Sequence, residues 1–174
     1  LAHDGVQVRT GHQATRFSVD DGQRWLHATH QGQPVRIGFD ALLVAVGRSA
    51  NLAGYGLEEL GVATGRTVEV NGLLQTSIPG IYAAGDVAGP YQFTHAAAHQ
   101  AWYAAVNALF SPFKTFTVDN RVMPAATFTE PEVARVGLNL REAAEQGVPH
   151  EATRYGIDDL DRAIADGEAH GWVQ

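Results

Sequence analysis

Residues 76 to 89 read TSIPGIYAAGDVAG, and this stretch constrains the fold more than any other part of the 174-residue chain. Pro79-Gly80 predicts a tight turn, because proline presets its own φ and glycine accepts a positive φ. Ile81 to Ala84 predict a buried strand of small residues, with Asp86 following at its carboxyl end. Ligands of open α/β sheets bind at that edge. We therefore expect the Asp86 carboxylate to accept a hydrogen bond from a ligand hydroxyl, the alternative being an aspartate that only caps a turn.

The longest helix is expected to begin near Thr94 and to continue through Phe110. Thr94 is the expected N-cap, and Ser111-Pro112 should end the helix, because the residue before a proline is biased away from the helical region. Alanines fall on one face of this helix, which should let a neighbour approach closely; they are residues 97, 101, 104, 105 and 108. A shorter helix is expected around Leu57 to Leu60.

The first forty-six residues have the pattern of short strands and turns. Asp20-Asp21-Gly22 and Gln31-Gly32-Gln33-Pro34 favour hairpin connections and predict an antiparallel meander. The strands expected in it cover Val6 to Arg9, Ala14 to Val19, Trp25 to His30 and Val35 to Ile37. Ala41 to Val46 are continuously apolar, which is typical of a strand buried on both faces of a parallel sheet. Thr67 to Val70 predict one further strand.

A linker over residues 111–121 precedes a second region of short elements. Two strand-like stretches flank Glu130-Pro131-Glu132. A short helix should follow, with Asn139 as its N-cap, Glu142 as the reciprocal partner of a capping box and Gly147 as its stop. A last strand is expected to begin at Trp172.

Composition excludes several functions. The chain carries 12 basic and 19 acidic residues, a net charge of −7, and its dispersed basic residues argue against binding to nucleic acid or to an anionic membrane. No apolar run approaches the roughly 20 residues of a membrane helix and no signal peptide is recognised, so a cytoplasmic location is expected. The absence of cysteine rules out a thiol nucleophile or a thiolate metal site within these residues. His95 and His99 share a helix face, but no third ligand is evident, so no metal site is expected.

Three segments together carry a resemblance to a known family. The pattern VNGLLQTSIPGIYAAGDV, joined to LLVAVGRSANL upstream and QFTHAAAHQ downstream, resembles the second FAD-binding signature of the pyridine nucleotide-disulfide oxidoreductases. That family includes dihydrolipoamide dehydrogenase, glutathione reductase and mercuric reductase. FTEPEVARVGL resembles the start of its C-terminal dimerisation domain. The sequence QFTHAAAHQA is most similar to that of the mercuric reductase-like branch.

The resemblance implies roles for seven residues, all in cofactor binding and none in catalysis. Asp86 would bind the ribityl hydroxyls of FAD, with Val87 beside it. Gln92, Phe93, Thr94 and His95 would lie against the isoalloxazine ring, with the start of the helix directed at the flavin edge that gathers negative charge on reduction. Gly47 would lie beside the nicotinamide nucleotide, NADH or NADPH, where a side chain would obstruct it.

The resemblance also implies the organisation of the chain, which would be a middle-to-C-terminal portion of a family member. The expected fold is α/β: a partial Rossmann-like FAD/NAD(P)-binding domain with an antiparallel meander, followed by the start of an α+β dimerisation domain. Residues 1–46 would be the remnant of the NAD(P) domain, 47–111 the second part of the FAD domain and 121–174 a truncated dimerisation domain. The pyrophosphate-binding G-x-G-x-x-G loops and the redox cysteines are missing from these residues.

The expected function is a part of a homodimeric enzyme that passes hydride from NAD(P)H to FAD and on to a disulfide, a metal ion or another acceptor. The 174-residue chain alone is expected to be inactive, because most of each nucleotide site is missing. Two alternatives stay open at this point. The chain could be a non-catalytic folding or dimerisation module that binds no cofactor by itself, or a relative of the thiol-free NADH dehydrogenases and ferredoxin reductases.

Overall fold

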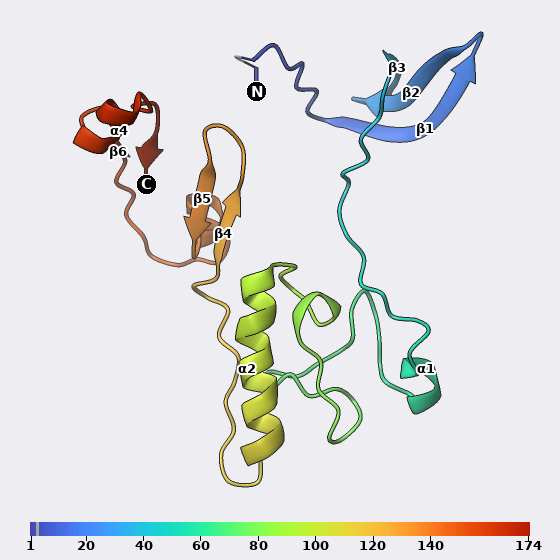
Figure 1. Cartoon of the computed structure of the whole chain (residues 1–174), viewed down its shortest axis with the longest axis vertical. Helices are drawn as coiled ribbons and strands as arrows, with labels where there is room; N and C mark the ends of the chain where they lie inside the picture. The colour runs from blue at the N-terminus through green and yellow to red at the C-terminus, as the bar shows by residue number, and fades with distance from the viewer. Residues whose placement is uncertain (3) are drawn as a thin grey trace. The chain divides into compact units, whose positions relative to one another are not determined.

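The computed structural model describes residues 1–2 and 4–174, which divide into two compact units, residues 1–48 and 49–174 (Figure 1). The first unit is an antiparallel sheet in the order β1-β2-β3, and the second unit holds all the helices among the described residues. The elements are β1 (His12–Asp20), β2 (Gln23–His30), β3 (Gln33–Phe39), α1 (Leu57–Leu60), the short 3₁₀ helix η1 (Gly85–Val87), α2 (Thr94–Phe110), β4 (Pro124–Thr127), β5 (Val133–Val136), α3 (Leu140–Glu145), β6 (Tyr155–Gly156), α4 (Asp161–Asp166) and β7 (Trp172–Val173).

Two tight turns set the register of the first unit. Asp20 pairs with Gln23 and His30 pairs with Gln33, so each hairpin has a two-residue loop. Both residues of each loop have positive φ, Asp21 and Gly22 at 50° and 81°, and Gln31 and Gly32 at 50° and 77°. This is the type I′ pattern, whose twist matches that of the flanking strands. The predicted antiparallel meander is therefore confirmed.

Helix α2 organises the second unit, and its bounds are those expected from the sequence. Its fully buried side chains include two amides, Gln100 and Asn107. Asn107 donates to the carbonyl oxygens of Leu73 (3.0 Å) and Phe116 (2.8 Å) and accepts from the Phe116 amide (2.8 Å). One side chain thereby ties two loops to the helix. The buried apolar side chains of residues 49–121 are Val62, Val68, Leu74, Ala88 and Ala96, and the Thr76 side chain is buried as well.

The alanine face of α2 is largely not the packed one. Ala101, Ala105 and Ala108 are exposed, whereas Ala96 on the adjacent face is completely buried. The predicted close approach occurs at Ala97, against Gly85. The packed face was misjudged because glutamine and asparagine occupy two of its positions.

Four predicted strands are absent from the described residues. Val6 to Arg9 and Ala41 to Val46 are not strands, and Thr67 to Val70 and Ile81 to Ala84 take part only in the isolated bridges Thr64 to Val68 and Gln75 to Tyr82. Ala41 to Val46 were expected to be buried, yet Leu43 is 88% and Val46 90% exposed. A strand needs the backbone groups of a neighbouring strand, and no described segment pairs with this run.

The region after residue 121 forms two small two-stranded sheets and two short helices. Strands β4 and β5 flank Glu130-Pro131-Glu132 as predicted, β7 begins at Trp172, and β6 pairs with β7. The capping box of α3 is confirmed: the Asn139 side chain accepts from the Glu142 amide (2.9 Å), and Glu142 accepts from the Asn139 amide (3.1 Å). The Asn139 amide, aided by Arg135, lowers the pKa of Glu142 below its ordinary value of 4.5. The stabilisation of the folded state by this cap is therefore fully present above pH 4.5, and it is lost as the pH falls through the lowered pKa of Glu142.

Within the part of the chain that the structure describes, no helix is both long enough and apolar enough to cross a membrane.

Replacing Asn107 should loosen the segment after α2. In Asn107→Ala the backbone groups of Leu73 and Phe116 lose their partners, each loss costing about 1–3 kcal/mol when the group stays buried, although alanine is the better helix former. We expect the amide hydrogen of Phe116 to exchange at least tenfold faster. Asn107→Asp, which keeps the acceptor but removes both donors, should protect that amide better than the alanine variant. Unchanged exchange in Asn107→Ala would show that the buried amide is dispensable.

Candidate functional site

The turn at residues 85–89 presents one acidic side chain to solvent. Gly85 has φ of 79° and opens η1, in which Asp86 is the middle residue. The Asp86 carboxylate is exposed and has no hydrogen bond or ion pair with any residue that the structure describes. The preceding Ala84 is extended but is not part of a strand, so the prediction that Asp86 ends a buried strand is wrong in that detail. The acid remains an available acceptor because its carboxylate has no partner among the described residues, and the backbone around it is fixed by its own hydrogen bonds.

Gln100 holds this turn, although it was not among the residues predicted from the sequence. Its Oε1 accepts from the Gly85 amide at 2.6 Å, and its Nε2 donates to the Gly89 carbonyl at 2.6 Å. The signal was present: Phe93, Ala96, Gln100, Tyr103 and Asn107 follow the three-and-four spacing of one helix face. An amide at a position of that face where an apolar residue is usual indicates a buried polar contact.

The start of α2 lies directly after the turn. Its N-cap is Phe93, in an extended conformation and without a side-chain cap, so the prediction that Thr94 is the N-cap is wrong. The Phe93 carbonyl accepts from the Ala97 amide (2.9 Å), and the amides of residues 94–96 are the ones an α-helix leaves without intrahelical partners. No acidic side chain lies in this first turn. The helix start is therefore a concentration of positive partial charge that no side chain of its own neutralises.

Three rings are stacked in succession at this helix start. The centroid of the Phe93 ring lies 5.3 Å from that of His95, with the ring planes 14° apart, and 6.1 Å from that of Tyr91, with the ring planes 20° apart. His95 is exposed, and its Nε2 lies 2.8 Å from the Pro124 carbonyl oxygen. A carbonyl only accepts, so Nε2 carries the hydrogen. His99 bonds the Asp119 carbonyl in the same way at 3.0 Å.

His95 and His99 therefore point their Nε2 atoms at backbone oxygens of the segment after α2. Among the described residues no group of three or more His, Cys, Asp and Glu side chains could hold a metal ion.

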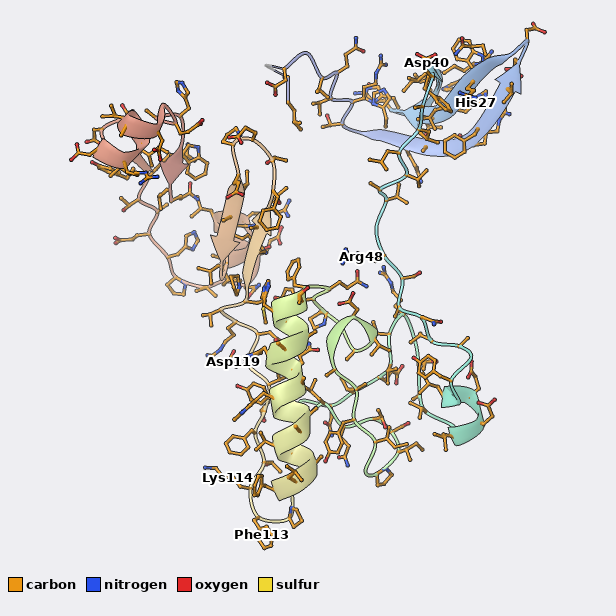
Figure 2. All side chains as sticks on the ribbon, viewed as in Figure 1. His27, Asp40, Arg48, Phe113, Lys114 and Asp119 are labelled. Carbon is orange, nitrogen blue, oxygen red and sulfur yellow. The ribbon has the colours of Figure 1, made fainter. Side chains whose placement is uncertain are left out.

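An open groove of about 700 Å³ lies beside this segment, lined by Tyr91 and residues 117–121. Figure 2 shows Asp119 next to α2, with Lys114 and Phe113 at the turn where the chain reverses. The Arg121 side chain and backbone donate to the Asp119 carboxylate and hold its pKa well below the usual range. Asn120 Oδ1 is buried without a hydrogen-bond partner among the described residues. Nothing in the composition of the linker over residues 111–121 predicts this groove.

The structure brings together six of the seven predicted cofactor residues. Asp86, Val87, Gln92, Phe93, Thr94 and His95 lie in one continuous turn and helix start. Val87 is half-buried, and its carbonyl accepts from the Val68 amide at 2.8 Å. Gly47 belongs to the other unit, where it is exposed with φ of 127° and has open space at its Cα.

Comparisons with known proteins identify the family and the fold of the chain. The family model of the pyridine nucleotide-disulphide oxidoreductases matches residues 1–101, and that of their dimerisation domain matches residues 123–174. A dihydrolipoyl dehydrogenase of Chlamydia pneumoniae is 33% identical over 97% of this chain and 36% of its own length, and a mercuric reductase of Shewanella putrefaciens is 34% identical over 98% of this chain and 30% of its own. The Cu(II) complex of a cysteine-to-serine mutant of the HOCl-induced flavoprotein disulfide reductase RclA of Escherichia coli has a TM-score of 0.83 at 27% identity, covering 98% of this chain and 38% of that one.

The chain belongs to the pyridine nucleotide-disulphide oxidoreductase family, as predicted from its motifs. The likeness to a solved flavoprotein disulfide reductase also confirms the predicted α/β fold class, with Rossmann-like and dimerisation parts. The chain spans about a third of the length of the curated relatives it matches.

Gly85 should tolerate no side chain, for two separable reasons. Alanine at φ of 79° costs about 1–2 kcal/mol in the left-handed region, and its Cβ would lie 3.1 Å from the Ala97 Cβ. Gly80 is the matched control, with φ of 82° and nothing within 4 Å. We expect Gly85→Ala to lower the thermal midpoint more than Gly80→Ala. Equal losses would mean that only the backbone conformation matters at Gly85.

Proposed function

We propose that the protein containing this chain is an FAD-dependent NAD(P)H oxidoreductase. One observation carries the proposal: an exposed acid without a partner among the described residues, Asp86, stands between Gly85 and an uncapped start of α2, in a chain that belongs to a family of redox enzymes. FAD would supply the chemistry of accepting a hydride from the nicotinamide and passing its electrons on.

The residues present fit a flavin in their donor and acceptor chemistry. Asp86 offers a carboxylate to the ribityl hydroxyls, and a charge-assisted bond of this kind contributes about 1.5–3 kcal/mol. Val87 follows Asp86 in η1, Gln92 precedes α2, and Phe93, Thr94 and His95 form the start of that helix. The free amides of that start would stabilise negative charge on the nearby edge of a reduced flavin ring. Gly47 would leave room for the nicotinamide nucleotide.

The acceptor of the electrons belongs to a broad class: a disulfide, a metal ion or another oxidant. This breadth reflects the relatives, whose names are dihydrolipoyl dehydrogenase and mercuric reductase. The alternative of a non-catalytic module applies to the 174 residues alone. Ala41 to Val46 are exposed and Gly47 has open space around it, so these residues by themselves would form an incomplete nucleotide site.

Several finer proposals accompany this function. The match to the dimerisation domain supports a homodimer formed through residues 121–174, with residues 1–46 and 47–111 as portions of the NAD(P) and FAD domains. A cytoplasmic location is also proposed, and cell fractionation would test it.

Removing the acid should weaken flavin binding. In the intact protein, Asp86→Asn should raise the dissociation constant for FAD about 10- to 100-fold, because a charge-assisted hydrogen bond is replaced by a neutral one or none. The measurement is a fluorescence titration of protein stripped of flavin. Glu69→Gln removes an exposed acid of the same unit and should leave the constant unchanged. A parent protein that stays colourless after incubation with FAD would refute the proposed function.

Association can be tested separately. We expect sedimentation equilibrium of the intact protein at tens of micromolar to give twice the mass of one chain. A single-chain mass across that range would remove the homodimer and leave the flavin proposal standing.

A further inference from the structure

We propose that Gln100 is the positioning residue of the flavin-binding turn and that it sets the direction of the Asp86 carboxylate. This inference rests on the proposed function, because it names the residue through which Asp86 would be held in place for FAD. Gln100 is completely buried on α2, and Asp86 is exposed on the turn. The two act through backbone and not through a direct contact.

One side-chain amide holds both ends of the turn. Gly85 offers an amide hydrogen to Gln100 Oε1, and Gly89 offers a carbonyl to Gln100 Nε2, both at 2.6 Å. These partners also settle which end of the side-chain amide is oxygen, since an N–H only donates and a carbonyl only accepts. A residue at this position must therefore accept at one end and donate at the other.

The rest of the turn is held by backbone groups. The Gly85 carbonyl accepts from the amides of Ala88 (2.9 Å) and Gly89 (3.0 Å), and the Val87 carbonyl accepts from Val68 (2.8 Å). Gly85 packs against Ala97, so the turn lies directly on α2. The Asp86 side chain has no bond of its own to any described residue. Its direction is consequently determined by the backbone on either side of it, which Gln100 fixes to the helix.

The chemical requirement predicts how substitutions will rank. Leucine at position 100 fills similar space but leaves the Gly85 amide and the Gly89 carbonyl unpaired. An ionised glutamate still accepts from Gly85 but faces the Gly89 carbonyl with a negative oxygen. A protonated glutamate can accept at one oxygen and donate from the other, which restores both bonds. Flavin binding by Gln100→Glu should therefore improve as pH falls.

The test is FAD titration of the intact protein, stripped of flavin, between pH 5.5 and 8.5. Gln100→Leu should raise the dissociation constant at least tenfold at every pH. The dissociation constant of Gln100→Glu should equal that of Gln100→Leu at pH 8.5 and should fall toward the parent value at pH 5.5. The titratable groups nearest in the chain are Asp86 in the turn and His99, which precedes Gln100 on α2. Both are also present in the parent protein, so the FAD dissociation constant of each variant is divided by that of the parent at the same pH.

Asn107→Leu is the matched control. It removes the other fully buried amide of α2, seven residues on, which holds Leu73 and Phe116 and not the Asp86 turn. It should lower the thermal midpoint while leaving the FAD constant of the folded protein within about twofold of the parent. If Asn107→Leu weakens FAD as much as Gln100→Leu, the effect is general destabilisation and the positioning role is overturned.

A double-mutant cycle tests whether Gln100 affects FAD binding through Asp86. If Gln100 acts through Asp86, adding Gln100→Leu to Asp86→Asn should weaken FAD by less than the product of the single effects. Full multiplication of the two effects, or a flat pH response of Gln100→Glu, would overturn the proposal. Failure of the parent to bind FAD would overturn the proposed function itself, whereas an effect of Asp86→Asn with none from Gln100→Leu would overturn only this inference.

Discussion

The second unit depends on buried amide side chains along one helix. Gln100 and Asn107 lie two turns apart on the packed face of α2, and each is completely buried. Between them they provide partners for backbone groups of residues 73, 85, 89 and 116. Loops have polar backbones that cannot be buried unpaired. The helix can bury irregular segments against itself because its own side chains complete their hydrogen bonds.

The same requirement explains the part of the chain that is not folded into a sheet. The run from Ala41 to Val46 has the composition of a strand buried on both faces, yet it is exposed and belongs to no strand. Its backbone has no neighbouring strand among the described residues, and its side chains have no covering layer. The meander of β1 to β3 forms without such help, since each strand finds its partner through a two-residue turn. Strands β1 to β3 therefore find their partners locally, whereas Ala41 to Val46 would need a distant segment and stay unpaired among the described residues.

Some features of the candidate site likewise depend on local sequence, and others depend on tertiary packing. The motif around Asp86 and the helix start at Thr94 were predictable, because glycine, proline and the end of an apolar run have local consequences. The family followed from the same motifs. The cap was predicted at Thr94 but lies at Phe93, and the strand before Asp86 is only an extended segment with one bridge. These details depend on what packs around the turn, which a local pattern does not specify.

The sequence by itself determined the hairpins, the bounds of α2, the capping box of α3 and the placing of an acid between glycines, because each depends on residues a few positions apart. Only the tertiary structure decided that the amides of α2 face inward, that Gln100 spans the turn bearing Asp86, and that His95 and His99 bond the segment after the helix. Those contacts join residues 11 to 34 positions apart. Whether such groups meet depends on how the loops close against the helix, and that is set by packing and backbone pairing over the whole unit.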